Sequence, residues 1–288
     1  MKLDGRRESS NVEDRRRLSG GGKAGLGLGG IAIVAILTLL MGGDLGDVFR
    51  NVVDSGGLSS TTQTSYEPTA ENEALATFSR QILASTEDVW SSYFRKNNIG
   101  TYKAPTLVLY TGATSTACGT GQAAMGPFYC SADEKLYIDL SFFSSMRQQL
   151  GADGDFAYAY VIAHEVGHHV QHLLGTLDQA HQQMARMSKT DANRMSVRIE
   201  LQADFYAGIW AHYENQMFDS IEDGDLEEAI RCASVIGDDY LQKKAQGYAV
   251  EESFTHGTAA QRMRWLKKGM TTGDIRQGNT FSLSDNQL

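Results

Sequence analysis

Two histidines and a glutamate stand close together in the segment His164-Glu165-Val166-Gly167-His168. On an α-helix, positions four apart are rotated by only about 40°, so the side chains of His164 and His168 point the same way. Two such imidazoles can hold one Zn²⁺, and Glu165 can reach a water bound to that metal. Zinc lowers the pKa of the water toward ~7, and a carboxylate can then take its proton. This spacing therefore predicts zinc-dependent hydrolysis of an amide bond.

A catalytic zinc site needs a third protein ligand, and the sequence offers three alternatives. The longer motif H-E-x-x-H-x-x-G-x-x-H is excluded, because Gln171 and Leu174 stand where it needs Gly and His. His172 follows on the same helix, but its direction has drifted by about 80° from that of His164, which is too far to surround one metal. Glu200 lies on a second predicted helix and can approach from the other side. We therefore prefer Glu200 as the third ligand.

Two further residues are candidates for supporting roles. Asp204 lies one turn beyond Glu200, and a zinc-bound imidazole usually donates its free N–H to a carboxylate, so we expect Asp204 to accept that hydrogen bond. The alternative is a solvated acidic stripe, but the small and apolar residues over 203–210 indicate burial. His256 lies in a Gly/Thr-rich loop, where functional residues are common. It could stabilise the oxyanion of a tetrahedral intermediate or could simply begin the following helix.

The elements that must position these residues are mainly helices. Apolar residues recur at helical spacing over 155–175, where Asp153 or Asp155 can cap the start and Gly175 can end the helix. The same reasoning predicts further helices at 73–96, 191–218, 225–244 and 260–269. Strands are predicted from β-branched and aromatic residues at 104–111, 128–130 and 135–140. The expected class is α+β.

Composition limits the class of protein. The chain has 288 residues, 41% hydrophobic and 21% charged, enough for one sizeable domain with appendages or for two small domains. The net charge of −9 argues against a nucleic-acid-binding protein. The division that we expect is a basic disordered head at 1–23, a flexible linker at 44–71, a folded domain at 72–281 and a loose tail at 282–288.

The segment 24–43 carries no charge, and twenty such residues just span a hydrocarbon core of about 30 Å. We prefer one N-terminal transmembrane helix over a cleaved signal peptide, because no A-x-A site follows, and over a buried helix, because the flanks are polar. The basic head would then stay in the cytoplasm. The folded domain would lie outside it, in the periplasm or at the cell exterior.

Three cysteines bear on the compartment. Cys118 and Cys130 are twelve residues apart with a glycine-rich loop between them, and outside the cytoplasm they are expected to form a disulfide. The alternative is a pair of buried free thiols. They are poor zinc candidates, because the histidine site does not need them. Cys232 is left over and is expected to be buried and inert.

Longer stretches of the chain carry a resemblance to a known family. The segments HEVGHH, ELQADFYAG and FTHGTAAQR, with CGTG and GPFYCSADEKLYIDLSFF before them, closely resemble those of the bacterial neutral zinc metallopeptidases, over about 72–281. The resemblance implies a zincin-like fold of the gluzincin type: a small mixed or antiparallel sheet over the active-site helix and a mainly helical C-terminal half. It implies His164, His168 and Glu200 as zinc ligands and Glu165 as general base. It also implies that LYIDLSFF includes the strand that pairs with an extended peptide substrate.

We therefore predict a membrane-anchored zinc metalloendopeptidase that acts on a peptide or protein substrate. The alternative is a zinc-containing, membrane-tethered binding or assembly factor without proteolytic activity. The presence of Glu165 argues against that alternative, because holding zinc does not require this carboxylate. A third possibility is a metal hydrolase that cleaves a non-peptide amide with the same site.

Overall fold

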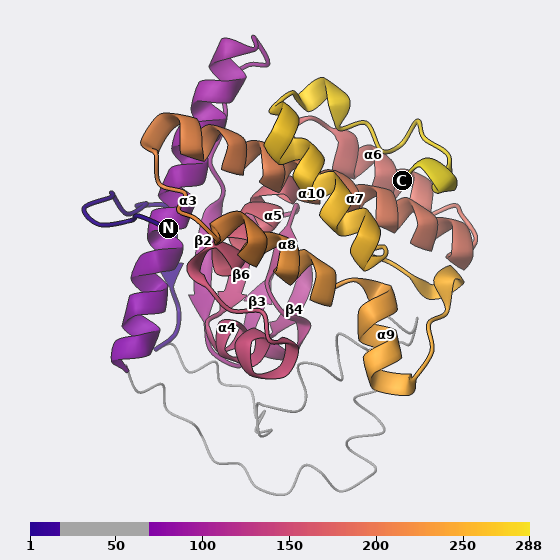
Figure 1. Cartoon of the computed structure of the whole chain (residues 1–288), viewed down its shortest axis with the longest axis horizontal. Coiled ribbons are helices and arrows are strands. Elements are labelled where there is room, and N and C mark those ends of the chain that lie inside the picture. The colour runs from indigo at the N-terminus through magenta and orange to yellow at the C-terminus, as the bar shows by residue number, and fades with distance from the viewer. Residues whose placement is uncertain (18–68) are drawn as a thin grey trace, which may run out of the picture.

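The computed structural model describes residues 1–17 and 69–288, which form a small sheet beside a larger body of helices (Figure 1). The strand order is β1-β2-β6-β5. The two central strands, β2 (Thr106–Tyr110) and β6 (Lys135–Asp139), are parallel to each other and mostly buried. β5 (Phe128–Cys130) runs antiparallel to β6 at one edge of the sheet. The sheet is therefore mixed, and among the described residues β5 is its terminal strand on the side away from β6.

A separate hairpin of β3 (Ala113–Thr116) and β4 (Gly119–Gln122) lies between β2 and β5 along the chain. A disulfide joins Cys118 at the tip of this hairpin to Cys130 at the end of β5. It therefore ties the hairpin to the edge strand of the main sheet. Cys232 is a free, buried thiol.

Helices make up most of the remaining described residues. The long α3 lies along one side of the molecule beside the N-terminal segment, while α7 and α10 lie on the other side of α5 (Figure 1). The helices are α3 (Ala70–Lys96), α4 (Ser141–Ser145), α5 (Asp155–Leu173), α6 (Thr176–Met184), α7 (Lys189–Phe218), α8 (Asp225–Val235), α9 (Asp238–Gln246) and α10 (Ala259–Thr272). Short turns are the 3₁₀ segments η1 (Ala123–Met125), η3 (Glu251–Ser253), η4 (Ile275–Gln277) and η5 (Asp285–Gln287), and the π-helical η2 (Met146–Leu150).

The core explains why α5 is the centre of the arrangement. Almost every residue of α5 from Phe156 to Gln171 is buried, because α3, α7 and α8 pack around it. The ring of Phe156 stacks on Trp210 of α7, with 5.7 Å between centroids. The N-terminus of α5 is capped by a residue distant in the chain: the carboxylate of Glu228 in α8 accepts the N–H of Phe156 at 3.1 Å. The predicted side-chain cap from Asp153 or Asp155 is therefore wrong.

The single helix predicted over 225–244 is in fact two helices, α8 and α9. Gly237 lies at the break, where a Cβ would stand only 2.2 Å from the backbone nitrogen of Ala259. The start of α10 passes directly over this glycine, so the chain turns here instead of continuing as one helix. Helical periodicity alone cannot reveal such a contact, because Ala259 lies more than twenty residues farther along the chain.

The N-terminal residues differ from the disordered head predicted for 1–23. β1 (Val12–Asp14) pairs in parallel with Leu107–Leu109 of β2 and completes the sheet. Around it, Ser9 is buried and donates to Glu87 of α3 at 2.6 Å, and the buried Arg16 forms an ion pair with Asp14. Several of the charges that suggested a solvated head thus pair with α3 of the folded domain, among them Arg7 with Glu87 and Arg16 with Glu73.

This pairing also corrects the predicted membrane topology. Within 1–17 and 69–288, no helix is long and apolar enough to cross a bilayer. The segment 24–43 lies outside the described residues, as does the predicted linker up to residue 68. Because β1 precedes the segment and β2 follows it, their pairing requires both flanks to lie on the same side of any membrane. The predicted N-terminal single-pass transmembrane helix, with head and domain on opposite sides, is therefore wrong.

The C-terminal residues also pack against the domain. Leu288 is buried, and Asp285 pairs with Arg198 of α7 at 2.7 Å. The amide of Gln202 donates to the carbonyl of Gly278 at 2.8 Å. The prediction of a loose tail at 282–288 thus missed its contacts with α7, which are polar and give no apolar periodicity.

We expect Arg6 to be important for stability. Its guanidinium pairs at 3.0 Å with Glu214, which is fully buried and accepts further hydrogen bonds from Ser85 and Ser220. Arg6→Ala leaves that carboxylate without its cation and should lower the free energy of unfolding by about 2–3 kcal/mol. The control is Arg147→Ala, because Arg147 and its partner Glu71 are both exposed and such an ion pair contributes about 0–1 kcal/mol. Urea denaturation measures both variants, and equal losses would contradict the prediction.

Candidate metal centre

α5 presents His164 and His168 on one face, one turn apart. Their ring centroids are 4.8 Å apart and the two rings are nearly perpendicular. Glu200 of α7 lies across from them. Its Oε2 is 3.0 Å from Nε2 of His164, and its Oε1 is 3.5 Å from Nε2 of His168. Two imidazole nitrogens and one carboxylate oxygen, all within 4.8 Å of one another, converge on one point.

This donor set fits zinc. Catalytic zinc sites have three protein ligands of the imidazole and carboxylate types and keep one position open. Burial opposes ionisation of Glu200, but the neighbouring imidazoles of His168, His256 and His164 outweigh burial and hold the pKa of that carboxylate well below its usual value. Burial lowers the pKa of His164, while Asp204 and Glu200 outweigh it and raise the pKa to about 10. Zinc must therefore displace a proton from this imidazole when it binds.

The approach of α7 depends on Gly167, the fourth residue of the motif. A Cβ at this position would lie 2.8 Å from the carbonyl oxygen of Ala203 and 3.1 Å from its Cα. Both atoms belong to the backbone of α7 and cannot turn away. The backbone of α7 can therefore come this close to α5 at Ala203, one turn from Glu200, only because the motif has glycine at position 167.

Gly167→Ala should push α7 away from α5 and displace Glu200 from the histidines. We expect zinc affinity to fall by at least about tenfold and the free energy of unfolding by about 1–3 kcal/mol. Ala203→Gly is the control: it weakens the helix by about 1 kcal/mol but creates no clash, so zinc affinity should stay the same. A competition titration with a chromogenic chelator measures the affinities. Unchanged affinity in Gly167→Ala would show that the contact does not position Glu200.

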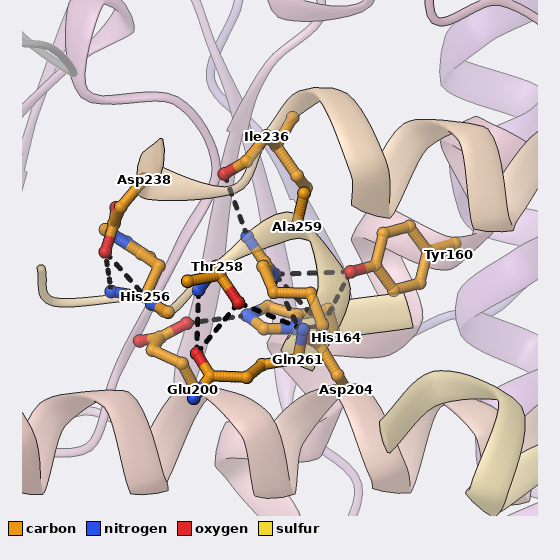
Figure 2. A network of polar contacts seen from close by, with 12 residues as sticks. Tyr160, His164, Glu200, Asp204, Ile236, Asp238, His256, Thr258, Ala259 and Gln261 are labelled. Carbon is orange, nitrogen blue, oxygen red and sulfur yellow. Dashed lines mark hydrogen bonds and ion pairs between the residues drawn. The ribbon is translucent and has the colours of Figure 1, made fainter. Parts of the chain in front are cut away.

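Asp204 lies on the far side of His164 from Glu200 (Figure 2). Its Oδ1 is 2.8 Å from Nδ1 of His164 and accepts the hydroxyl of Tyr160 at 2.6 Å. Arg262 of α10 holds the same carboxylate through two nitrogens, at 2.9 and 3.0 Å. Burial raises the pKa of Asp204, but Arg262 and His164 outweigh burial and lower it to about 2. An ionised Asp204 accepts the Nδ1–H of His164, which leaves Nε2 free to face Glu200.

The position of Asp204 beside His164 was predicted from the sequence, but its other partners, Tyr160 and Arg262, were not. Tyr160 lies four residues before His164 on the same helix face, so the spacing could have identified it. Arg262 had no comparable signal, because it comes from α10, 58 residues beyond Asp204. Gln171 lies three residues after His168 on the same helix, so the spacing could have identified it too. Its Oε1 is 2.9 Å from Nδ1 of His168, and its amide donates to the carbonyl of Ile199 at 2.8 Å. Both ligand imidazoles are thus held on the side away from the metal position.

Glu165 and His256 line the same cavity as the three donor residues. Glu165 is 7% exposed, and burial raises the pKa of its carboxyl above the usual value. His256 is half-buried and comes from the loop before α10. The structure therefore places Glu165 and His256 in the cavity that also holds the three donor residues, although they lie 91 positions apart in the chain.

The loop that carries His256 is organised by Asp238, a fully buried residue at the start of α9 (Figure 2). One carboxylate oxygen, Oδ2, accepts the backbone N–H groups of Thr255, His256 and Gly257 at 2.7, 2.7 and 2.9 Å. The other oxygen, Oδ1, lies 3.4 Å from Nδ1 of His256. Asp238 thus fixes the backbone of His256 and lies beside its imidazole, whose Nδ1 is also 3.0 Å from Oγ1 of Thr255. This role of Asp238 could not be predicted from the sequence, because helical periodicity placed the residue inside one continuous helix.

His169, next to His168, is a core residue and takes no part in the donor set. Its Nε2 donates to the carbonyl of Lys103 at 2.7 Å, and its Nδ1 accepts the hydroxyl of Tyr129 at 2.9 Å. Burial lowers the pKa of His169 to about 4, from an ordinary value of 6.5. The imidazole is therefore neutral in the folded protein at neutral pH.

This buried imidazole predicts acid sensitivity. Between about pH 4 and 6.5 the unfolded chain binds a proton at His169 that the folded protein does not, so stability rises with pH in that window. The contribution is complete above pH 6.5 and falls by about 3 kcal/mol as the pH drops to 4. Urea denaturation at a series of pH values should show this slope, and His169→Gln should lack it. The same slope in both proteins would assign the acid sensitivity to other groups.

Comparison with known proteins places the chain in a zinc metallopeptidase family. A sequence model of the family described as "Putative neutral zinc metallopeptidase" matches residues 1–281. "Uncharacterized protein YpfJ" from Escherichia coli K12 is 48% identical over 289 residues, which cover 99% of this chain and 100% of that protein. "Uncharacterized protein Rv2575" from Mycobacterium tuberculosis H37Rv is 40% identical over 194 residues, 64% of each chain. No solved structure matches the chain.

Proposed function

The chain belongs to the neutral zinc metallopeptidase family with zinc as its cofactor, and from this premise we propose that it hydrolyses internal peptide bonds with Glu165 as the general base. One observation carries the proposal. His164, His168 and Glu200 place three donor atoms within 4.8 Å of one another, and Glu165 lines the same cavity. A protein that only stored zinc would not need a buried carboxylate beside these donors.

Each residue has a distinct role. When bound by His164, His168 and Glu200, zinc supplies a Lewis acid that polarises the scissile carbonyl and makes water more acidic. Glu165 accepts a proton from the attacking water and then delivers it to the leaving amine. Because burial raises the pKa of Glu165, its protonated form is easier to reach near neutral pH, which favours the second transfer.

His256 is proposed to donate a hydrogen bond to the oxyanion that forms when water adds to the carbonyl. Asp238 supports this role, since it faces Nδ1 of His256 at 3.4 Å and leaves Nε2 to act as the donor. Asp204 is proposed to orient His164 from the opposite side through the 2.8 Å contact with Nδ1.

We propose that an extended peptide substrate pairs with the free edge of β5. The resemblance had implied this role for the segment LYIDLSFF, but β6 of that segment is paired on both sides, with β2 and with β5. β5 therefore occupies the edge of β6 over Lys135–Tyr137, so we prefer β5 as the strand that pairs with the substrate, and the role implied for LYIDLSFF stays a prediction. β5 is the terminal strand of the sheet, and Phe128 and Tyr129 from it line the cavity. A peptide added there would pass beside the zinc ligands.

Cleavage of a peptide mixture by the purified full-length chain tests the proposed function. The expected result is about one zinc per chain by elemental analysis and cleavage that a zinc chelator abolishes and added zinc restores. A protein that holds zinc and yet cuts no peptide would be a binding or assembly factor instead. Cleavage that the chelator leaves unchanged would also contradict the proposal.

We also propose that the domain works outside the reducing cytoplasm. The Cys118–Cys130 disulfide supports this location, because disulfides persist in the bacterial periplasm and at the cell exterior and are rare in the cytosol. Alkylation of intact cells followed by mass spectrometry tests it. Recovery of both cysteines as free thiols would contradict the proposed location.

A further inference from the structure

The cavity at the zinc ligands has a volume of about 400 Å³, enough for side chains on both sides of a peptide bond. We propose that this cavity selects peptides with large apolar side chains, such as Leu, Ile, Met or Phe, beside the scissile bond and rejects charged ones. This inference rests on the proposed peptidase function and adds the substrate class to it.

One apolar wall comes from α6 and α7. Leu177, Met184 and Ile199 line the cavity, and Leu177 and Ile199 belong to a small hydrophobic cluster with Tyr129 and Met184 packed against it. Ile199 directly precedes the ligand Glu200. An apolar substrate side chain that entered here would extend this cluster and lose its contact with water, which favours binding by about 1.5–3 kcal/mol for a Leu or Phe side chain.

A second apolar wall comes from segments that precede α5 and follow α8. Phe142 of α4, Leu150 of η2 and Ile236 after α8 line the same cavity, together with Val161 of α5. Val161 lies one turn before His164, whereas α6 follows the end of α5. The ligands thus lie between two apolar groups. This arrangement suits a substrate with apolar side chains flanking the bond that is cut.

Apart from four histidines, the acidic and basic residues that line the cavity in the described part of the chain are Glu165, Glu200 and Arg262, and each has a partner or a role. His164, His168 and His256 belong to the site, and burial lowers the pKa of the fourth, His181, so that its imidazole stays neutral at neutral pH. Glu165 and Glu200 serve the zinc site. Arg262 is held by Asp204 at 2.9 and 3.0 Å and donates to Tyr160 at 3.2 Å. None of the three is left to pair with a charged substrate side chain. Burying an unpaired charge is far more costly than burying an apolar group, so the walls discriminate against Asp, Glu, Lys and Arg.

The test is a peptide library with every residue type on both sides of each bond, incubated with the zinc-loaded full-length chain and read by mass spectrometry. We expect Leu, Ile, Met and Phe to be enriched at least about fivefold over charged residues at one or both positions beside the cut. Glu165→Gln is the background control. Cleavage without side-chain preference, or with preference for charged residues, overturns the inference and leaves the peptidase function intact. No cleavage above background overturns both.

A matched pair of variants tests the wall on α6. Met184 lines the cavity, while Met187, three residues farther, is an exposed methionine that does not. Met184→Glu should lower kcat/KM for a Leu-containing peptide by at least about tenfold, with zinc content and Tm unchanged. Met187→Glu should leave it unchanged. Met184→Gln adds no charge, so its kcat/KM should fall by a smaller factor. It replaces Met184→Glu in the comparison if that variant does not fold. Equal kcat/KM in the Met184 and Met187 variants would overturn the inference.

Discussion

We expect Glu165→Gln to slow peptide cleavage by at least about a hundredfold and to leave zinc in place. The amide has almost the same shape as the carboxylate but cannot accept a proton from water, so the general base is removed without changing the donor set of His164, His168 and Glu200. General bases typically contribute about 10²–10⁴-fold to rate, and we expect a loss of kcat in that range. Single-turnover assays at saturating peptide, with zinc measured on the same sample, check the result.

Two controls separate chemistry from folding in this experiment. The midpoint of thermal unfolding should not fall in Glu165→Gln, because burial opposes the charge of the native carboxylate and the amide has none. Peptide binding, measured as KM or by fluorescence anisotropy, should also persist. If the variant lost its zinc, Glu165 would be a ligand; if it kept full activity, another group would be the base.

Glu200→Ala removes zinc. The two imidazoles that remain both belong to α5, so nothing closes the metal position from the side of α7. A partner that merely supports a ligand typically contributes 10–100-fold to metal affinity, and we expect the loss of a direct ligand to exceed about 100-fold. Activity at limiting zinc should fall with occupancy. Dialysis against a zinc buffer followed by elemental analysis measures the dissociation constant.

His256→Ala is the matched control for Glu200→Ala. His256 lines the same cavity but is not among the three converging donors, so this variant should keep its zinc. Its kcat should fall by about 10²–10³-fold, the usual effect of losing one oxyanion donor. If Glu200→Ala retained zinc while His256→Ala lost it, the third ligand would be His256 and the arrangement proposed for the site would be wrong.

Much of the donor set could be predicted from the sequence because its rules are local. Two histidines four apart must share a helix face, and the apolar spacing around them indicated the helix that became α5. Glu200 and Asp204 obey the same rule on α7. Because a catalytic zinc site needs a third ligand, Glu200 was expected to face the histidines. In the structure its Oε2 lies 3.0 Å from Nε2 of His164.

The residues that the sequence did not reveal act across long separations. Arg262 reaches Asp204 from another helix. Asp238 binds the loop of His256 from the break between α8 and α9, which helical periodicity predicted as one continuous helix. β1 was missed for a related reason. Its three residues carry two acidic side chains, and only pairing with β2 makes them a strand. Contacts of this kind depend on tertiary packing, which no local pattern encodes.

The pairing of β1 with β2 means that the folded unit is not one continuous stretch of chain. A fragment that began at residue 70 would lack the segment that covers Leu107–Leu109. The N–H and C=O groups on that side of β2 would then be open to any other extended chain, including a second copy of the fragment. Such a fragment would tend to self-associate through its sheet, whereas the full-length chain occupies this position with its own first residues.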